Sequence, residues 1–473
     1  MKTTVKILAI ILALIFVFCA CATESPEVVP EFDQSGGSAD LNGARIKWAF
    51  SRSRYASSDD DYIFGFIPNT VFADTVVERE KQVEKDLNCV IETDFNADSN
   101  ILRSTLNASL MAGSRVFDIV TADSSSLNVF IKSGGFTPLS PLLDVTDTAK
   151  YGSPGMLMTM CHIDDVYGVV PFAWPDLLYS FAGHIIVVNE TFISRLSETD
   201  PRDYVENNEW TWDMFEEILP RYTFEDMGRT VYALKSHDAY FATGMFLSNG
   251  VAMSAFENGQ ITCGVFTDAG KQALERAQQI FLNTGKDYIY PDASTNQMVD
   301  LFINGDVTML VAFQSEVIGG STSIPYRTDY VVGVLPFPQG PNATPGKYFS
   351  SYEQIPYVTS IPVTADDAEA CAKIISAMYE PFEGYETKDD IIDYMDTQVF
   401  FDRRDSAVIM NMVTNTEYIY FWEGGRSAIE QSTNSRNPIS SIVEGLENNY
   451  NKLIEEYITP QLQGRMAIYG LDN

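Results

Sequence analysis

Histidine and positive charge are scarce in this chain of 473 residues. It contains three histidines, and its 31 lysines and arginines face 65 aspartates and glutamates, which gives a formal net charge of −34. His162, His184 and His237 show neither the His-x-x-His nor the His-Glu-x-x-His spacing of zinc enzymes. A body this acidic repels the phosphate backbone of nucleic acids, so we expect no nucleic-acid partner.

The sequence also lacks the cysteine spacing of a redox or metal site. Beyond the two cysteines near the N-terminus, the remaining ones are Cys89, Cys161, Cys263 and Cys371. No two of them form a Cys-x-x-Cys pair. We expect them to be buried small hydrophobes, and their spacing does not tell whether any two form a disulfide.

Motifs of common catalytic sites are absent as well. The chain has no Gly-x-Ser-x-Gly elbow and no phosphate loop, and its acidic run at 59–61 lacks the alternating spacing of a calcium loop. We therefore expect no catalytic residues, no metal and no cofactor. A surface polysaccharide-degrading enzyme that works with two carboxylates stays an alternative, because the sequence does not give the distance between carboxylates.

The N-terminus has the pattern of a secretory signal peptide over residues 1–20. Lys2 and Lys6 precede an unbroken apolar run at 7–18, which at ~1.5 Å per residue is too short for a hydrocarbon core of ~30 Å. Ala20 followed by Cys21 resembles a bacterial lipobox, in which the cysteine is lipidated and becomes the new N-terminus. We expect lipidation at Cys21, and cleavage with release of the chain is the alternative.

Residues 21–42 are expected to form the lipidated cysteine and a flexible tether. From residue 22 the chain is rich in Glu, Ser, Pro, Gly and Asp and poor in large apolar residues, a composition that does not fold by itself. Such a tether reaches roughly 25 Å.

Strand and helix patterns alternate along the rest of the chain. Strand-like runs lie at 45–50, 89–93 and 117–121, and helical patterns lie between them at 75–87 and 101–111. This alternation predicts a mostly parallel sheet covered by helices. A second set of strand-like runs lies at 185–189, 307–313 and 330–335. Because the chain is also longer than one core normally supports, we expect two α/β lobes.

Several segments resemble, in the same order, those of the family 1 extracellular solute-binding proteins, the maltose-binding-protein-like group. They are Asp118–Asp123 with Ser133–Leu139, Tyr167–Pro171 with Val187–Phe192, the Trp-Thr-Trp-Asp-Met-Phe run at 210–215, the Gly-centred turn at 302–309, and the Pro-Phe-Pro-Gln-Gly-Pro loop at 336–341. Each segment alone is a weak signal. Together, behind a lipobox, they resemble the family from Arg45 to Ala377.

The resemblance implies a two-lobed periplasmic-binding-protein fold of type II, with hinge crossings and a ligand cleft between the lobes. On that model the first lobe comprises residues 43–172 and 355–385, and the second comprises residues 173–354 and 386–473. The resemblance further implies a monomer that is lipid-anchored on the extracytoplasmic face of the cell membrane and works with the permease subunits of an ABC importer. Its ligand would be a small polar molecule, a sugar or oligosaccharide.

Candidate ligand-binding residues follow from the chemistry of a sugar, which has hydroxyls that donate and accept and apolar C–H faces that stack on rings. Ligands of open parallel sheets bind beyond the carboxyl ends of the strands. Asp123 ends such a strand and can accept from hydroxyls, or else cap the following turn onto Ser125. Ser124 and Ser125 share this ambiguity.

Further candidates lie in segments that the resemblance singles out. We expect Trp174 to stack on the ligand and Asp176 to accept from it, with hinge packing as the alternative for Trp174. Phe313 and Gln314 end a strand where the family often places an aromatic residue against the ligand, although a core phenylalanine fits the pattern too. Trp422, in a Gly-bearing loop, is either a platform for the ligand or a half-buried surface residue.

The loop after the first strand offers Arg52, Arg54 and Tyr55. If these side chains face the cleft, they suit an anionic solute such as a uronate or a peptide carboxylate. Solvated arginines that balance an acidic surface are the alternative. A peptide-binding or anionic-solute-binding protein therefore stays open, as does a sensor that reports its ligand state to a receptor.

Overall fold

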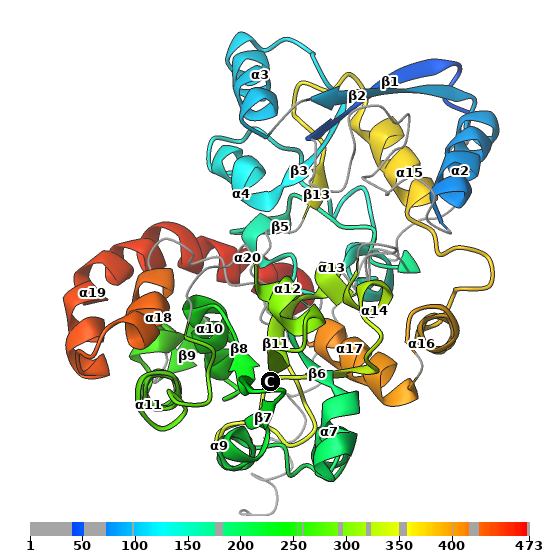
Figure 1. Ribbon diagram of the computed structural model, residues 1–473. Helices are drawn as coiled ribbons and strands as arrows, with labels where there is room; N and C mark the ends of the chain where they lie inside the picture. The colour runs from blue at the N-terminus through cyan, green and yellow to red at the C-terminus, as the bar shows by residue number, and fades with distance from the viewer. Residues whose placement is uncertain are drawn as a thin grey trace, which may run out of the picture. The chain divides into compact units, whose positions relative to one another are not determined.

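The computed structural model describes residues 40–51, 72–96, 99–175, 183–252, 254–257, 260–291, 297–317, 323–349, 357–400, 402–415 and 425–470. Residues 40–473 cluster into one compact unit. Its strands and helices are shown in Figure 1.

The first sheet has four strands in the order β13-β3-β1-β2. Their bounds are Ala44–Ser51 for β1, Cys89–Asn96 for β2, Ile119–Asp123 for β3 and Tyr357–Ser360 for β13. β1 pairs in parallel with β2 and with β3, whereas β13 runs antiparallel to β3. The helical patterns between the strands become α2 (Ala73–Asp86) and α3 (Ser99–Ala112). The predicted strand–helix alternation of this region is confirmed.

A buried hydrogen-bond chain ties three strands of this sheet to α15 (Ala368–Met378). The indole Nε1 of Trp48 donates to Thr121 Oγ1 at 2.8 Å, the hydroxyls of Thr121 and Thr359 lie 2.6 Å apart, and Thr359 lies 2.6 Å from the Tyr379 hydroxyl. Buried polar groups are costly unless they are paired. These hydrogen bonds therefore link β1, β3, β13 and the end of α15.

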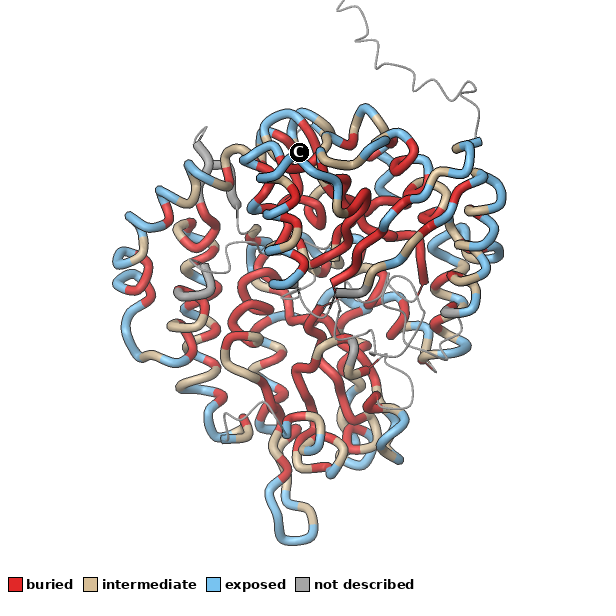
Figure 2. The backbone as a smooth tube through the Cα atoms, turned by 90° about the horizontal axis from the view of Figure 1, so that it is seen from above, coloured by how far each residue is buried: buried red, intermediate tan, exposed pale blue. Residues whose placement is uncertain are grey.

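The second sheet has five strands in the order β12-β6-β11-β8-β7. Their bounds are His184–Asn189 for β6, Phe224–Asp226 for β7, Arg229–Lys235 for β8, Val307–Phe313 for β11 and Val332–Leu335 for β12. β11 pairs in parallel with β8 and antiparallel with β6. All six residues of β6 are buried. Figure 2 shows that buried residues are concentrated in the interior of the molecule and exposed ones at its periphery. The second predicted set of strands is thus confirmed.

Helices surround the second sheet and continue to the C-terminus. Their bounds are Glu190–Leu196 for α7, Pro201–Glu206 for α8, Trp212–Arg221 for α9, Asp238–Leu247 for α10, Asp268–Gln279 for α11, Met298–Ile303 for α12, Gln314–Val317 for α13, Ile324–Arg327 for α14, Lys388–Gln398 for α16, Arg403–Thr414 for α17, Gly425–Asn434 for α18, Ile439–Leu453 for α19 and Thr459–Tyr469 for α20. A π-helical turn, η7 (Ile454–Ile458), joins α19 to α20.

A buried arginine fastens α7, α8 and α17 to each other. The guanidinium of Arg202 forms ion pairs with Glu190, Asp200, Asp402 and Asp405, and only 2% of its side chain is exposed. Asp405 also accepts a hydrogen bond from the backbone of Val334 in β12. A buried charge is tolerated where it is paired and hydrogen-bonded. This network therefore anchors α17 to the edge of the second sheet.

The C-terminal helices contact elements from both halves of the chain. α19 contacts α11 and α18, whereas α20 contacts the short hairpin of β4 (Cys161–His162) and β5 (Asp165–Val166). The backbone N–H of Ile163 in this hairpin donates to the carbonyl of Pro460 at 2.6 Å. The expected bounds of the two lobes stay a prediction.

The described cysteines Cys89, Cys161, Cys263 and Cys371 are buried, as expected of small hydrophobes. Among the described residues, no helix combines the length and the apolar character that a membrane span requires. In the same ranges, no group of histidine, cysteine, aspartate and glutamate side chains is arranged to hold a metal ion.

Candidate functional site

Polar residues lie at the edge of the first sheet where its parallel strands end. Ser51 at the end of β1 is opposite Asn96 at the end of β2, and Asp123 at the end of β3 is opposite Tyr357 at the start of β13. The carboxyl edge of an α/β sheet is where such folds bind ligands. This edge is therefore the first part of the candidate site.

Asp123 begins the short helix α4 (Ser124–Leu127) as its N-cap. Its Oδ1 accepts from the backbone N–H of Ser126 at 2.8 Å and from the Ser125 hydroxyl at 2.7 Å. The turn-capping role that the sequence left open is thus present. The cap uses one carboxylate oxygen, and contact between the other oxygen and a ligand stays a prediction.

Ser124 differs from Ser125 in its surroundings. Its side chain is fully buried, and its hydroxyl has no hydrogen-bond partner among the described residues. A buried hydroxyl without a partner is unfavourable by about 1–3 kcal/mol. Only a molecule enclosed beside Ser124 would satisfy this hydroxyl, because the side chain has no exposed surface.

The matching edge of the second sheet carries a cluster of rings. Phe313 at the end of β11 is opposite His184 at the start of β6, and their ring centroids lie 4.3 Å apart. Tyr240 of α10 stacks on His184 at 4.1 Å and meets Phe313 edge-on at 5.1 Å, and His237 lies 4.7 Å from Tyr240. Phe313 is partly exposed, so one face of this cluster is open.

Gln314 and Lys235 complete this second edge as buried polar residues. Gln314, at 4% exposure, begins α13, and its backbone N–H donates to the carbonyl of Gly183 at 2.8 Å. Lys235 ends β8, is 1% exposed, and holds its Nζ 5.7 Å from the centroid of the Tyr290 ring.

A hydrogen bond from His237 lowers the pKa of neighbouring Asp238, so this carboxyl is ionised at neutral pH.

Sequence reasoning missed His184, Lys235, His237 and Tyr240. His184 and His237 show no metal-site spacing, and Lys235 and Tyr240 belong to no motif in the sequence. The usable signal is the Lys-Ser-His run at 235–237, which begins with the last residue of β8. Polar residues in that position lie at the ligand-binding edge of an α/β sheet.

Trp174 lies in the interior of the protein. It is 0% exposed, its ring stacks on Phe382 at 5.3 Å and meets Tyr379 edge-on at 5.6 Å, and its Nε1 donates to the carbonyl of Glu380 at 3.3 Å. In this conformation the ring takes the packing role that the sequence left as the alternative. Its stacking on a ligand stays a prediction.

The remaining candidates lie outside the described residues. They are Arg52, Arg54, Tyr55, Asp176, Trp422 and the lipidation residue Cys21. Of the predicted site, the structure therefore locates Asp123, Ser124 and Ser125 at the first edge and Phe313 with Gln314 at the second.

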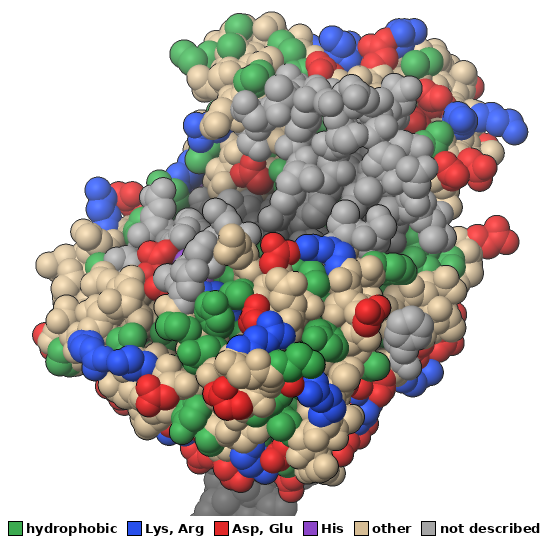
Figure 3. Space-filling view, viewed as in Figure 1, with side chains coloured by type: hydrophobic (Ala, Val, Ile, Leu, Met, Phe, Trp, Pro, Cys, Tyr) green, Lys and Arg blue, Asp and Glu red, His purple; other side chains and the backbone are tan. Residues whose placement is uncertain are grey.

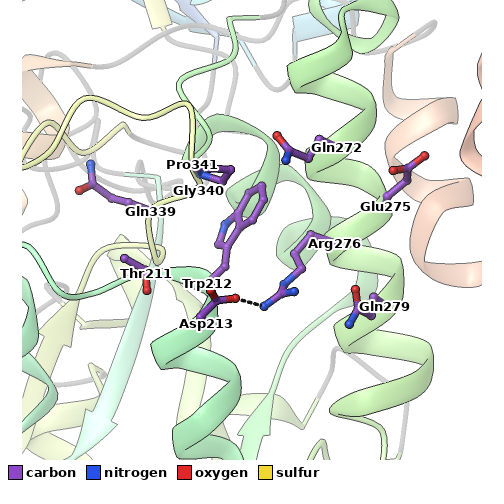
Figure 4. Close-up of a pocket in the computed structure, with 10 residues that line it drawn as sticks. All are labelled: Thr211, Trp212, Asp213, Gln272, Glu275, Arg276, Gln279, Gln339, Gly340 and Pro341. Carbon is purple, nitrogen blue, oxygen red and sulfur yellow. Dashed lines mark hydrogen bonds and ion pairs between the residues drawn. The ribbon is translucent and has the colours of Figure 1, made fainter.

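A surface hollow of about 450 Å³ lies between α9, α11 and the loop that contains Gly340 (Figure 4). Arg276 of α11 forms ion pairs with Asp213 and Glu216 of α9, and Figure 4 marks the first of these. The Trp212 ring in its wall is only 5% exposed. Because the charges are already paired and the ring is covered, this hollow is a weaker candidate than the strand edges.

The surface around these elements is mixed in charge. On the face shown in Figure 3, acidic and basic side chains stand next to each other among hydrophobic and uncharged ones. Arg229 with Asp306 and Arg327 with Asp300 are examples of such exposed pairs. Exposed pairs contribute little stability, so this surface gives no further indication of a ligand.

The family model described as bacterial extracellular solute-binding protein matches residues 88–381, more than half of the chain. No curated protein matches.

Several solved structures share the fold at low sequence identity. A cyclo/maltodextrin-binding protein complexed with maltotetraose is 13% identical, with a TM-score of 0.57 over 89% of this chain and 99% of that one. An ABC substrate-binding protein from Listeria monocytogenes in complex with cycloalternan is 14% identical, with a TM-score of 0.55 over 88% and 100%. A sugar transporter from Rhizobium etli in an open conformation is 15% identical, with a TM-score of 0.58 over 86% and 99%.

Proposed function

Because the chain belongs to the family of bacterial extracellular solute-binding proteins, we propose that it is the substrate-binding component of an ABC importer for an oligosaccharide. The expected two-lobed α/β fold of maltose-binding-protein-like proteins is confirmed. The ligand class and the transporter partner are the finer parts of the proposal. Family and fold give the class of protein, and the ligand must be argued from side chains.

The observation that carries the proposal is the difference between the two sheet edges. The first edge presents oxygen acceptors and a hydroxyl, from the partly exposed Asp123 and Ser125. The second edge presents a partly exposed ring, Phe313, which is held by His184 and Tyr240. A sugar needs both, because its hydroxyls exchange hydrogen bonds while its C–H faces pack on aromatic rings.

Proteins with the same fold support the sugar class. Two of the similar structures hold maltotetraose and cycloalternan, both of which are oligosaccharides. At 13% and 14% identity, these likenesses establish the fold and not the ligand. They justify the first compounds to test.

Ligand binding would work by closure of a hinge between the lobes. A ligand that contacts both lobes only in the closed form shifts the population toward that form, in proportion to its difference in affinity. A micromolar dissociation constant corresponds to about −8 kcal/mol, which a few hydrogen bonds and stacked rings supply after the ordering costs. The closed form would then be recognised by the permease subunits.

We further propose that Cys21 is lipidated and holds the protein, as a monomer, on the extracytoplasmic face of the membrane. The tether at 21–42 would keep the compact unit clear of the lipid surface. Mass spectrometry of the mature N-terminus tests this: a diacylglycerol-modified Cys21 supports the anchor, whereas an unmodified N-terminus in the culture medium supports release. Cys21→Ala should abolish the modification and leave ligand binding unchanged.

The experiment that tests the ligand class is isothermal titration calorimetry on the chain from residue 22, which contains the whole compact unit. The panel comprises maltotetraose, cycloalternan, shorter sugars, a uronate and short peptides. We expect saturable binding of one carbohydrate class, weakened at least tenfold by Phe313→Ala. Gln279→Ala in the surface hollow of Figure 4 is the matched control and should bind like the wild type.

Other outcomes would point elsewhere. Binding of a peptide or uronate with no neutral sugar bound would replace the carbohydrate proposal with the anionic-solute alternative. Release of shorter sugars from a polysaccharide during incubation would favour the hydrolase alternative. Loss of sugar binding in Gln279→Ala but not in Phe313→Ala would move the site from the strand edges to the surface hollow.

A further inference from the structure

Four partly exposed residues lie in one row at the edge of the second sheet. Phe313 ends β11, and His237, Asp238 and Tyr240 lie at the start of α10, which follows β8 (Figure 1). The ring centroids of Tyr240 and Phe313 lie 5.1 Å apart, and those of His237 and Tyr240 lie 4.7 Å apart. The ring that is proposed to carry the sugar is therefore continuous with an ionisable pair, His237 and Asp238.

The Nδ1 atom of His237 has both a donor and an acceptor as neighbours. As the N-cap of α10, His237 places Nδ1 3.3 Å from the backbone nitrogen of Ala239, and the same atom lies 3.0 Å from Asp238 Oδ1. A neutral imidazole either accepts at Nδ1 from Ala239 or donates from Nδ1 to Asp238, whereas an imidazolium only donates. Protonation of His237 therefore makes Nδ1 a donor to Asp238.

The start of α10 accommodates both protonation states. The backbone N–H of Ala239 also donates to Asp238 Oδ1 at 2.8 Å, so it keeps an acceptor when Nδ1 of His237 becomes a donor. A positive charge is unfavourable at a helix N-terminus and a negative charge is favourable there. Because the Asp238 carboxylate offsets the imidazolium, the helix can remain folded while the charge of His237 changes.

We propose that His237 makes sugar binding at the second edge depend on pH, and that it acts through Asp238. This inference rests on the proposed function. When His237 is neutral, the ionised Asp238 accepts a hydrogen bond from a sugar hydroxyl beside the Phe313 ring. When His237 is protonated, its charge-assisted hydrogen bond neutralises the Asp238 carboxylate, which then is a weaker acceptor for the sugar.

The charge of Asp238 stays constant in the relevant pH range. The hydrogen bond from His237, opposed by burial and aided by the Ala239 N–H, lowers the pKa of Asp238. Histidine side chains ordinarily titrate between about pH 5 and 8, well above this carboxyl. Within the pair, only the imidazole therefore gains or loses a proton in that range.

Ionisable groups on the neighbouring elements leave one competing source of pH dependence. They are Lys235 of β8, His184 of β6 and Glu316 of α13 around the ring cluster, and Arg276 of α11 and Glu430 of α18 on the two helices that pack along α10. Arg276 is already paired with Asp213 and Glu216. Of these side-chain types, only histidine ordinarily changes its charge near neutral pH, so His184 must be separated from His237 by experiment.

Isothermal titration calorimetry with maltotetraose and cycloalternan, at about pH 5 and about pH 8, tests the inference. A hydrogen bond to a charged acceptor contributes more than one to a neutralised acceptor, and the difference corresponds to about fivefold in affinity. We therefore expect the dissociation constant of the wild-type protein to rise about fivefold on acidification. Equal affinities at the two pH values, or tighter binding at the lower one, would overturn the inference.

His237→Asn is the diagnostic variant. Asparagine still offers a side-chain acceptor at the start of α10 but takes up no proton, so the affinity should be the same at both pH values. His162→Asn, on the β4–β5 hairpin, is the matched control and should keep the fivefold change. A change that persists in His237→Asn would assign the pH dependence to another group, such as His184, and refute the role of His237.

Asp238→Asn tests the second half of the inference. This variant lacks the carboxylate charge, so at about pH 8 it should bind sugar as weakly as the acidified wild-type protein, without a further change on acidification. Wild-type affinity at about pH 8 would exclude Asp238 as the acceptor. If a variant shows no cooperative unfolding transition, the corresponding glutamine variant, His237→Gln or Asp238→Gln, takes its place.

Proton NMR provides a measurement that needs no sugar, because the chain has only three histidines. The imidazole signal that is missing from His237→Asn should titrate at a lower pH in Asp238→Asn than in the wild-type protein, since the anionic partner is gone. An unchanged titration would overturn the pair. If neither sugar binds at either pH, the proposed function fails and this inference fails with it, whereas binding without pH dependence overturns this inference alone.

Discussion

At the scale of single residues, the capping role of Asp123 and its proposed role in ligand binding can be tested separately. Its Oδ1 caps α4, and a carboxylate is expected to contact the ligand. Asp123→Asn keeps an oxygen for the cap, so we expect near-wild-type stability but weaker sugar binding. Asp123→Ala loses both and should destabilise the protein by about 0.5–2 kcal/mol. Urea unfolding and calorimetry on both variants check this; unchanged affinity in Asp123→Asn would leave Asp123 with the cap alone.

Glu80 on α2 links stability to pH. Burial, and next the charge of Glu84, raise the pKa of Glu80 to about 7 against the opposing charge of Lys81. In the unfolded chain the pKa is about 4.3. The folded state therefore binds more protons between these values, and its stability falls as pH rises through this window.

Glu80→Gln removes this penalty. We expect the variant to gain stability relative to wild type at pH 8 and to gain little at pH 4, where Glu80 is mostly protonated in both states. Urea unfolding at the two pH values measures the difference. Glu78→Gln, an exposed glutamate on the same helix, removes the same charge and is the control. An equal gain at both pH values would refute the titration of Glu80 as the cause.

At the scale of elements, α20 depends on a close approach to the β4–β5 hairpin. A Cβ on Gly464 would lie 2.4 Å from the backbone nitrogen of His162 and 2.9 Å from the carbonyl oxygen of Asp165. Backbone atoms cannot move aside cheaply. Gly464→Ala should therefore push α20 away from the hairpin and cost about 1–3 kcal/mol.

Gly445 in α19 offers the opposite case. A Cβ there would have nothing within 4 Å. Gly445→Ala should stabilise the protein by about 0.5–1 kcal/mol, because alanine loses less backbone entropy in a helix than glycine does. Thermal unfolding of the two variants compares them directly. Similar effects in both would mean that α20 is not tightly packed on the hairpin.

At the scale of the whole molecule, the fold predicts a coupled change in stability and compactness. Saturation with a ligand at 100 times its dissociation constant should add about 2.7 kcal/mol to the free energy of unfolding. If the lobes close around the ligand, small-angle X-ray scattering should also show a smaller radius of gyration. Stabilisation with an unchanged radius would mean that binding proceeds without closure.

The fold was largely predictable because it rests on local periodicity. The runs at 45–50, 89–93 and 117–121 became β1, β2 and β3, and the helical pattern at 75–87 became α2. Alternating strands and amphipathic helices permit few other arrangements. The family, too, followed from short motifs in a fixed order, and the family model confirms it.

The candidate site was predictable only where one segment suffices. Asp123, Ser124 and Ser125 follow a strand directly, so sequence alone placed them at the edge of the sheet. The sequence left two roles open for Trp174, and only its neighbours Phe382 and Tyr379, more than 200 residues away, show the ring enclosed in packing.

Sequence by itself determined the acidic charge, the strand–helix alternation, the family and the caps that neighbouring residues form. Tertiary structure alone decided which distant side chains meet. His184 reaches Phe313 because β6 pairs antiparallel with β11, and Arg202 reaches Asp405 because α8 and α17 both pack against β12. Local preferences act over a few residues, whereas these contacts depend on strand pairing and helix packing across the whole chain.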